Sequence, residues 1–266
     1  METYLRAVIF DVDGTLYDYR TRSVLPSTLE AVERLRERGV KIVIASGRSY
    51  ALLGSALVRL IQPDYYVLSN GHELLERGGR PLYLERFTAE ETESLLAAAR
   101  ELDIHVMLKY HRYSCVCSGW DEMRRIFGAL TLDEGAYRRC AREDFRRREP
   151  PLGMTLKGGP HMRQQLSGRW DSLRIEYFHD PSECDVFHRG TNKLTGLEKV
   201  LEQAGIPLEA CAAFGDSGND VDMLRRVGWG VAMGNGSPEA KAAARLVCGP
   251  SWEDSIRDTL RRLGLV

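Results

Sequence analysis

Near the start of the chain lies the stretch Ala7-Val8-Ile9-Phe10-Asp11-Val12-Asp13-Gly14-Thr15-Leu16. Its first four residues predict a buried strand, and Gly14 predicts a turn after it. In an extended segment, residues i and i+2 point to the same side, so we expect Asp11 and Asp13 to face one site. Two like charges held together repel each other unless a cation or a shared proton relieves them. The pair therefore predicts a metal-dependent acid site at the carboxyl edge of a sheet, where open α/β folds bind their ligands.

The composition is typical of a globular protein. The chain has 266 residues, of which 43% are hydrophobic and 28% are charged, and this length allows one large domain or two unequal ones. A formal net charge of -1 gives no electrostatic reason to expect nucleic acid or an acidic membrane as a partner. No apolar run is long enough to span a bilayer, and Glu2 and Arg6 argue against a signal peptide. Six scattered cysteines are typical of reduced thiols, so we expect a cytoplasmic protein, and the oligomeric state stays open.

Strand-like and helix-like segments alternate in two parts of the chain. The first part predicts strands at 7–10, 41–45 and 65–68, with helices at 26–38 and 50–61 between them. The second part predicts helices at 192–204, 220–227 and 238–244, strands at 211–214, 230–233 and 245–248, and a last helix that ends at Leu263. This order predicts an α/β fold with a Rossmann-like three-layer α/β/α core, in which helices cover both faces of a parallel sheet.

The middle of the chain has a different pattern. A helix at 89–102 is followed by strand-like runs at 104–110, 113–117, 154–157 and 173–178, with two arginine-rich helical stretches and one short helix among them. Helices and paired strands in this arrangement predict a smaller α+β domain. We therefore expect a core domain made of residues 1–82 and 186–266, interrupted by an inserted domain at residues 83–185.

Polar residues gather where the predicted core strands end. They are Asp11 and Asp13 with Gly14 and Thr15, the segment Ser46-Gly47-Arg48, Lys193, and the segment 215–220, which reads Gly-Asp-Ser-Gly-Asn-Asp. Because parallel strands end at one edge of a sheet, these segments can meet although they are far apart in the sequence. Together they offer carboxylates for a hard cation, a hydroxyl, backbone N–H groups at a helix start and an ammonium group. This set is suited to phosphoryl transfer with Mg²⁺.

The same segments resemble a known family. The matching stretches are FDVDGTL (10–16), ASGR (45–48), SNG (69–71), NK (192–193), FGDSGND with ML (214–220 and 223–224) and GVAMGN (230–235). Their order resembles that of the haloacid dehalogenase-like phosphohydrolases of the Cof type, whose class IIB cap domain is inserted between the third core strand and the lysine. Ser46 stands where threonine is commoner, and Leu194 stands where glycine is usual.

The resemblance implies a role for each matching residue. Asp11 would attack phosphorus to form an aspartyl-phosphate, and Asp13 would act as general acid and then as general base. Mg²⁺ would be held by Asp11, the backbone carbonyl of Asp13 and Asp216, with Asp220 in support. The phosphoryl oxygens and the substrate would be held by Ser46, Gly47, Lys193 and Asn219, with Arg48 and Asn70 directed towards the substrate.

The implied function is a Mg²⁺-dependent phosphatase of small phosphorylated metabolites, such as a sugar phosphate or a nucleotide-like monoester. Two alternatives stay open. One is a phosphomutase, which passes the phosphoryl group to a sugar hydroxyl. The other is a catalytically silent binding or regulatory protein on the same fold.

Other motifs in the chain favour structural roles. A calcium-binding EF-hand that starts at Asp11 would need glycine and glutamate where Leu16 and Arg22 stand. The Gly-Asp-Ser-Gly segment at 215–218 also occurs in serine proteases, but such an enzyme needs an upstream catalytic histidine and an all-β fold. Asn219 likewise breaks the G-x-S-x-G pattern of other hydrolases.

Two clusters in the inserted domain have similar structural explanations. His111, Cys115 and Cys117 could be imagined as zinc ligands, but no second cysteine pair completes a site, so core packing is favoured. The basic run consists of Arg138, Arg139, Arg142, Arg146, Arg147 and Arg148. We expect it to form a solvated helix face, with attraction of an anionic substrate as the weaker alternative.

Overall fold

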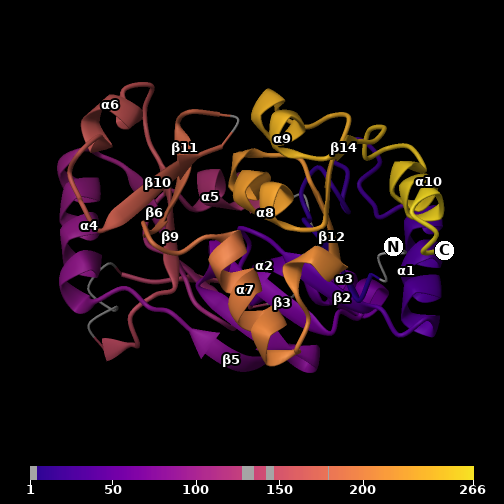
Figure 1. Cartoon of the computed structure of the whole chain (residues 1–266). Helices are drawn as coiled ribbons and strands as arrows, with labels where there is room; N and C mark the ends of the chain where they lie inside the picture. The colour runs from indigo at the N-terminus through magenta and orange to yellow at the C-terminus, as the bar shows by residue number, and fades with distance from the viewer. Residues whose placement is uncertain (1–4, 128–134, 142–146, 179) are drawn as a thin grey trace.

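The apolar run at the start of the chain lies at the centre of an eight-stranded sheet (Figure 1). All four side chains of β1 (Ala7–Phe10) are buried. The strand pairs in parallel with β12 (Cys211–Gly215) on one side and with β2 (Lys41–Ala45) on the other. The structure is a computed structural model that describes residues 5–127, 135–141, 147–178 and 180–266.

Five further strands complete this core sheet. The order is β14-β13-β12-β1-β2-β3-β4-β5. The outer strands are β3 (Tyr65–Leu68), β4 (Glu73–Glu76), β5 (Arg80–Leu84), β13 (Trp229–Ala232) and β14 (Leu246–Val247). The predicted strands all pair in parallel, but β4 and β5 were not predicted and add two antiparallel neighbours. They follow because Ser69, Asn70 and Gly71 have positive φ angles of 48°, 53° and 102°, which reverse the chain directly after β3.

Helices cover both faces of the core sheet and confirm the three-layer fold. Alternate residues of β1 point to opposite faces, so Val8 and Phe10 belong to one apolar cluster while Ala7 and Ile9 belong to the other. The first face carries α1 (Pro26–Glu37), α3 (Ser55–Ile61) and α10 (Ser255–Arg262), and the second carries α7 (Lys193–Gln203), α8 (Val221–Arg226) and α9 (Pro238–Ala243).

The helix predicted at 50–61 is instead two helices. They are α2 (Tyr50–Leu53) and α3, and Gly54 separates them with a φ angle of 77°. This conformation is open to glycine but interrupts a right-handed helix. No helix in the described part of the chain is long and apolar enough to cross a membrane.

The inserted residues form a second sheet of six strands, which we call the cap sheet. Figure 1 shows it at the left, with α4 (Ala89–Glu101) and α6 (Met162–Leu166) on the side away from the core sheet. On the opposite face, Met107 and Val116 pack with Met123 of α5 (Trp120–Phe127) and with Leu52 of the core. The strand order is β10 (Leu173–Tyr177), β11 (Glu183–His188), β9 (Gly153–Lys157), β6 (His105–Lys109), β7 (Ser114–Val116) and β8 (Tyr137–Arg139).

Two details of the cap sheet differ from expectation. Strand β11 was not predicted, and a domain boundary between residues 185 and 186 would fall inside it. Arg138 and Arg139 lie on β8 rather than on a helix. Their guanidinium groups stack over Tyr113 and Trp120, at 4.3 and 4.5 Å from the ring centroids, and a helical pattern of charges does not reveal such contacts. Residues 142–146 lie outside the described parts of the chain.

Cys115 and Cys117 pack as expected. Cys115 is buried in the apolar cluster of the cap sheet, and Cys117 packs against the same cluster. Both are free thiols.

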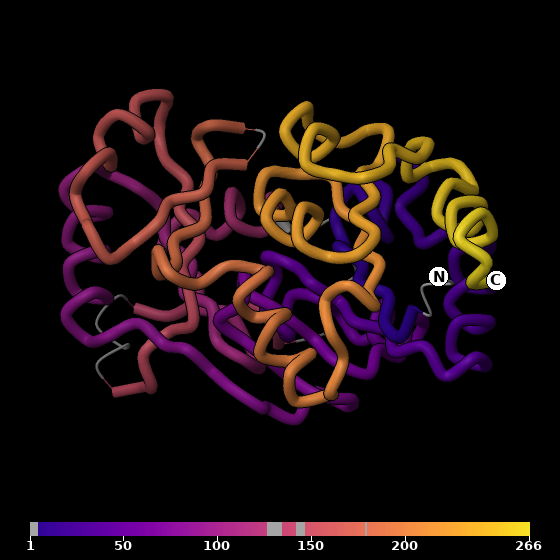
Figure 2. The backbone as a smooth tube through the Cα atoms, in the orientation of Figure 1, coloured from indigo at the N-terminus to yellow at the C-terminus, as the bar shows by residue number. Residues whose placement is uncertain are grey.

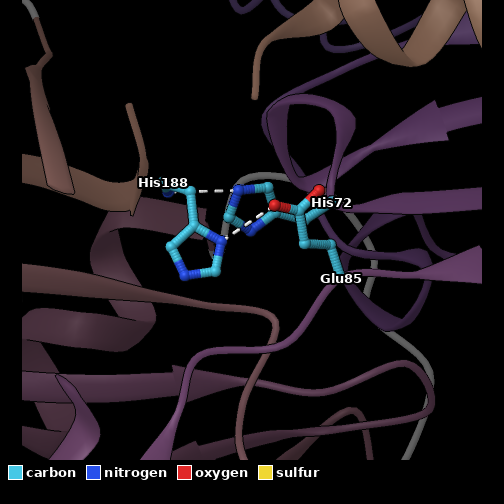
Figure 3. Close-up of side chains that lie close together, drawn as sticks. All are labelled: His72, Glu85 and His188. Carbon is cyan, nitrogen blue, oxygen red and sulfur yellow. Dashed lines mark hydrogen bonds and ion pairs between the residues drawn. The ribbon is translucent and has the colours of Figure 1, made fainter. Parts of the chain in front are cut away.

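The chain passes between the two sheets twice, after β5 and after β11 (Figure 2). His72, Glu85 and His188 meet at these crossings, and Figure 3 shows their side chains directed towards one another. His72 is buried and donates from Nδ1 to the Leu152 carbonyl at 2.6 Å, so its Nε2 accepts from the His188 N–H at 3.2 Å. The His188 ring lies between Glu85 and Glu91, at 3.0 Å from each carboxylate. These hydrogen bonds hold the two crossing segments together beside the core.

The first turn of α7 lies very close to the core sheet. A Cβ atom on Gly196 would lie 2.8 Å from Cγ1 of Val67 and 2.9 Å from Cα of Gly71. We predict that Gly196→Ala lowers the free energy of unfolding by about 1–3 kcal/mol, because the helix must move away from the sheet. Urea unfolding measures this loss. Gly190→Ala is the control, since nothing lies within 4 Å of its added Cβ, and equal stability of the two variants would contradict the prediction.

Acid should destabilise the fold through His72. Burial is the main cause that lowers the pKa of His72 to about 4, so the unfolded chain takes up a proton near pH 6.5 while the folded ring stays neutral. Stability is therefore lost as the pH falls from about 6.5 towards 4, by about 2 kcal/mol at pH 5. In His72→Asn, urea unfolding should show a shallower pH slope over this range. A slope equal to that of the wild type and of the exposed-site control His161→Asn would refute the assignment.

Candidate active site

Lys193 lies at the centre of the polar cluster below the carboxyl edge of the core sheet. It is the first residue of α7, which Asn192 caps by accepting from the Thr195 N–H at 2.8 Å. Its Nζ lies 2.6 Å from Oδ1 of Asp11 and 2.7 Å from Oδ1 of Asp220, and all three side chains are buried. Burial would lower the pKa of Lys193, but the two carboxylates outweigh burial and raise it. The lysine is therefore a fixed positive charge.

Asp220 organises the loop after β12. Its Oδ2 accepts from the backbone N–H groups of Asp216 and Ser217, each at 3.0 Å, while its Oδ1 accepts from Lys193. A Cβ atom on Gly215 would lie 2.6 Å from Cγ of Asp220, so only glycine leaves room for this carboxylate. Because both oxygens already accept hydrogen bonds, the geometry favours a supporting role for Asp220.

Asp11 and Asp216 each have a buried carboxylate oxygen that could still accept a hydrogen bond or hold a cation. Among the described residues, neither Oδ2 of Asp11 nor Oδ1 of Asp216 has a hydrogen-bond partner. Oxygens of Asp11, Asp216 and Asp220 lie within 4.8 Å of one another. Burial is the main cause that raises the pKa of Asp11 to about 7 and that of Asp216 to about 9. With all three carboxylates ionised, the one ammonium group would leave negative charge uncompensated. These residues therefore fit a divalent cation that prefers oxygen ligands and would displace their protons.

The turn at Gly14 brings Asp216 against the loop that follows β1. Gly14 has a φ angle of 80°, and a Cβ atom on it would lie 2.4 Å from Oδ2 of Asp216. Asn235 fixes the turn by donating to the Gly14 carbonyl at 2.8 Å. The stretch GVAMGN includes Asn235, but the sequence assigned it no role, because a structural amide in a loop has no distinctive pattern.

Asp13 is held by a buried arginine. Nε and Nη2 of Arg48 lie 2.7 Å from the two carboxylate oxygens of Asp13. Tyr19 donates to Asp13 Oδ1 at 2.6 Å. Burial would raise the pKa of Asp13, but Arg48 and then Tyr19 outweigh burial and lower it. Arg48 was expected to point towards the substrate; it engages Asp13 and also lines the cavity that Asp13 lines. Tyr19 was missed because an aromatic residue after a turn resembles a core residue.

The candidate phosphate-binding residues lie beside this pair. Ser46 Oγ accepts from the Arg48 N–H at 3.2 Å, so the loop after β2 closes on itself. Asn219 donates to Asn70 Oδ1 at 2.9 Å, and Asn70 Nδ2 would lie 3.2 Å from a Cβ atom on Gly47. The expected loops therefore meet at one edge of the sheet.

A cavity of about 570 Å³ connects these groups with the cap sheet. On the core side its walls include Asp11, Asp13, Ser46, Gly47, Arg48, Asn70, Asp216 and Asn219, while Lys193 and Asp220 are buried beneath them. On the cap side they include Ile126, Glu176, Tyr177, Phe178, Asp180, Glu183 and Asp185. The cap residues were missed, since no motif marks them and only the folded sheet places them over the core.

The three residues that meet at the chain crossings between the two sheets form a less suitable metal site. His72, Glu85 and His188 also bring possible ligand atoms within 4.8 Å of one another. However, both ring nitrogens of His72 and both of His188 already form hydrogen bonds with the protein. The Asp11 and Asp216 oxygens are thus the better candidates for a cation.

Comparisons with known proteins agree with this geometry. The family model described as haloacid dehalogenase-like hydrolase matches residues 8–260. Pyridoxal phosphate phosphatase YbhA of Escherichia coli is 30% identical over 268 residues, covering 94% of this chain and 96% of the relative. An HMP-PP phosphatase of Yersinia pseudotuberculosis is 31% identical, covering 89% of this chain and 86% of the relative.

Solved structures show the same arrangement of core and cap. The subclass IIB sugar phosphatase BT4131 has a TM-score of 0.88 and 28% identity, covering 98% of this chain and all (100%) of that one. BT1666 of Bacteroides thetaiotaomicron has a TM-score of 0.85 and 26% identity, covering 99% of this chain and 97% of that one. The chain therefore belongs to the haloacid dehalogenase-like hydrolases, as a Cof-type phosphohydrolase.

Proposed function

We propose that the protein is a Mg²⁺-dependent phosphatase that hydrolyses small phosphorylated metabolites through an aspartyl-phosphate on Asp11. The arrangement of Asp11 carries this proposal. One of its carboxylate oxygens is held by Lys193, and the other has no hydrogen-bond partner among the described residues. Asp11 also lines the cavity that a substrate would enter. An oriented carboxylate with one oxygen unengaged is suited to nucleophilic attack.

The reaction takes two displacements at phosphorus. A carboxylate oxygen of Asp11 forms a bond to phosphorus while the bond to the leaving oxygen breaks, and Asp13 gives that oxygen a proton. Asp13 then takes a proton from water as the water oxygen attacks phosphorus, which releases inorganic phosphate and restores the Asp11 carboxylate. Ser46, the Gly47 N–H, Lys193 and Asn219 would hold the phosphoryl oxygens throughout.

A divalent cation fits beside Asp11. Asp11, Asp216 and the Asp13 carbonyl would hold Mg²⁺, and Asp220 would orient the loop that carries Asp216. When bound, the cation supplies positive charge that offsets the clustered carboxylates and the phosphoryl oxygens.

Asp13 would act first as an acid and then as a base, and these two roles need opposite protonation states. Paired with Arg48 and Tyr19, its carboxylate has a lowered pKa and is ready to act as a base. The preceding acid step needs a proton on the same group. We infer that substrate binding loosens the Arg48 contact, because a phosphoryl group placed among these residues competes for the same guanidinium.

The cavity and the relatives support a metabolite-sized substrate. A volume of about 570 Å³ suits a small molecule. Relatives are named for pyridoxal phosphate, HMP-PP and sugar phosphates. We propose that the domain of the core sheet carries the chemistry and that the inserted domain of the cap sheet, with all of β11, closes over the substrate and excludes water. We also propose a cytoplasmic location, which the six free thiols support.

Removal of either proposed catalytic acid should abolish turnover or lower its rate strongly. Asp11→Asn should reduce hydrolysis of p-nitrophenyl phosphate to background, and Asp13→Asn should lower kcat by about 10²–10⁴-fold. Asp258→Asn, an exposed aspartate on α10, is the matched control and should retain the wild-type rate. Activity that survives Asp11→Asn would exclude the mechanism. Conversion of a sugar phosphate into its isomer without phosphate release would identify a phosphomutase.

Mg²⁺ should stabilise the folded protein even without substrate. Binding relieves repulsion among Asp11, Asp216 and Asp220, and a ligand present at 100-fold its Kd contributes about 2.7 kcal/mol. Thermal unfolding should therefore show a Tm that rises with Mg²⁺ concentration. The rise should shrink in Asp216→Asn and persist in Asp258→Asn. A wild-type Tm that is indifferent to Mg²⁺ would contradict the site.

A further inference from the structure

A buried ion pair crosses the cap sheet above the active site. Lys109 on β6 lies with its Nζ 2.6 Å from Oδ2 of Asp185 on β11, and their side chains are 2% and 4% exposed. Between them on β9, Thr155 donates to the other Asp185 oxygen at 2.7 Å. A buried pair costs desolvation energy, and well-packed apolar residues would serve stability equally well. The groups that the pair contacts therefore indicate whether it has a role beyond stability.

The pair contacts the core loop that follows β2. Lys109 Nζ also donates to the Gly47 carbonyl at 3.1 Å. A Cβ atom on Gly47 would lie 3.6 Å from Oδ2 of Asp185 and 3.2 Å from Nδ2 of Asn70. The loop is therefore enclosed between a cap carboxylate and a core amide. Gly47 and Asp185 both line the active-site cavity.

The peptide between Gly47 and Arg48 connects this contact to Ser46. Its carbonyl accepts from Lys109, and its N–H donates to Ser46 Oγ at 3.2 Å. Because a peptide unit is planar and rigid, holding its carbonyl also fixes the direction of its N–H. The Ser46 oxygen then uses a lone pair on the Arg48 N–H, which leaves the hydroxyl proton available to a phosphoryl oxygen.

We propose that Lys109 and Asp185 are a positioning pair: through the Gly47–Arg48 peptide they orient the Ser46 hydroxyl for the phosphoryl group. Asp185 fixes the position of the Lys109 ammonium group, and Lys109 in turn fixes the loop after β2 relative to the cap sheet. The loop is fully ordered only while the cap rests on the core. This inference relies on the proposed phosphatase activity for its functional consequence.

The test must separate positioning from stability. Lys109→Met alone leaves a buried unpaired carboxylate and destabilises the cap. The double variant Lys109→Met/Asp185→Asn removes both charges, and the amide oxygen introduced by the second substitution can still accept from Thr155. Thr155→Val is the matched control, because it removes a buried hydrogen bond to Asp185 but keeps both partners of the bonds from Lys109 to Asp185 and to the Gly47 carbonyl.

The double variant should fold with a Tm close to that of Thr155→Val, yet differ from it in three measurements. Its kcat on p-nitrophenyl phosphate should fall about 10–100-fold with little change in KM, as expected for a group that acts in the transition state. Inhibition by orthovanadate, which mimics the five-coordinate phosphorus of the transition state, should weaken. Hydrogen exchange of the peptide that contains Arg48 should become faster, while Thr155→Val retains the wild-type kcat and exchange.

Two results would overturn the proposal. One is a double variant with wild-type kcat and wild-type exchange in this loop. The other is a Thr155→Val variant that loses as much activity as the double variant at the same Tm, since the role would then be structural. If the wild type hydrolyses no phosphate ester, the proposed function fails, but hydrogen exchange still reports whether Lys109 orders the loop.

Discussion

The buried contact of Lys193 with Asp11 and Asp220 links the parts of this active site. It joins the central strand, the first turn of α7 and the loop after β12, with Nζ–oxygen distances of 2.6 and 2.7 Å. Two local features of the fold position Lys193 for this contact: close backbone packing at Gly196 and the helix N-cap at Asn192. Yet one ammonium group does not offset all the clustered carboxylates. The uncompensated negative charge suits the site to a cation, which would in turn offset the charge of a phosphoryl group.

A second set of contacts holds the groups that would touch the substrate in the proposed mechanism. Arg48 and Tyr19 hold the Asp13 carboxylate in its ionised form, while Lys109 and Asp185 of the cap reach the loop beside Ser46. In the proposed mechanism, the core therefore supplies the chemistry and the cap completes its geometry. Coupling of this kind allows the active site to be assembled only when the cap has closed and water has been excluded.

The sequence predicted most of the core because its signals are local. The run Ala7–Phe10 and the alternation of strand-like and helix-like segments are short-range patterns. The strand-end motifs could meet only at one edge of the sheet. What it missed depends on contacts between distant residues. Strands β4 and β5 follow a left-handed turn, β11 pairs within the cap sheet, and Arg48 is directed by Asp13. Lys109 and Asp185 lack a motif, since their roles arise only when cap and core are packed together. Tyr19 lacks one because its bond to Asp13 forms only when the loop after β1 has folded.

The most direct test of the account is to identify the residue that carries the phosphoryl group during turnover. The enzyme would be mixed with excess substrate and Mg²⁺, quenched in acid within the first turnovers, digested, and examined by mass spectrometry. The account predicts one phosphoryl group on the peptide that contains Asp11, at Asp11 itself, and its disappearance as the substrate is exhausted. A phosphoryl group on another residue, or turnover with none on the protein, would contradict it.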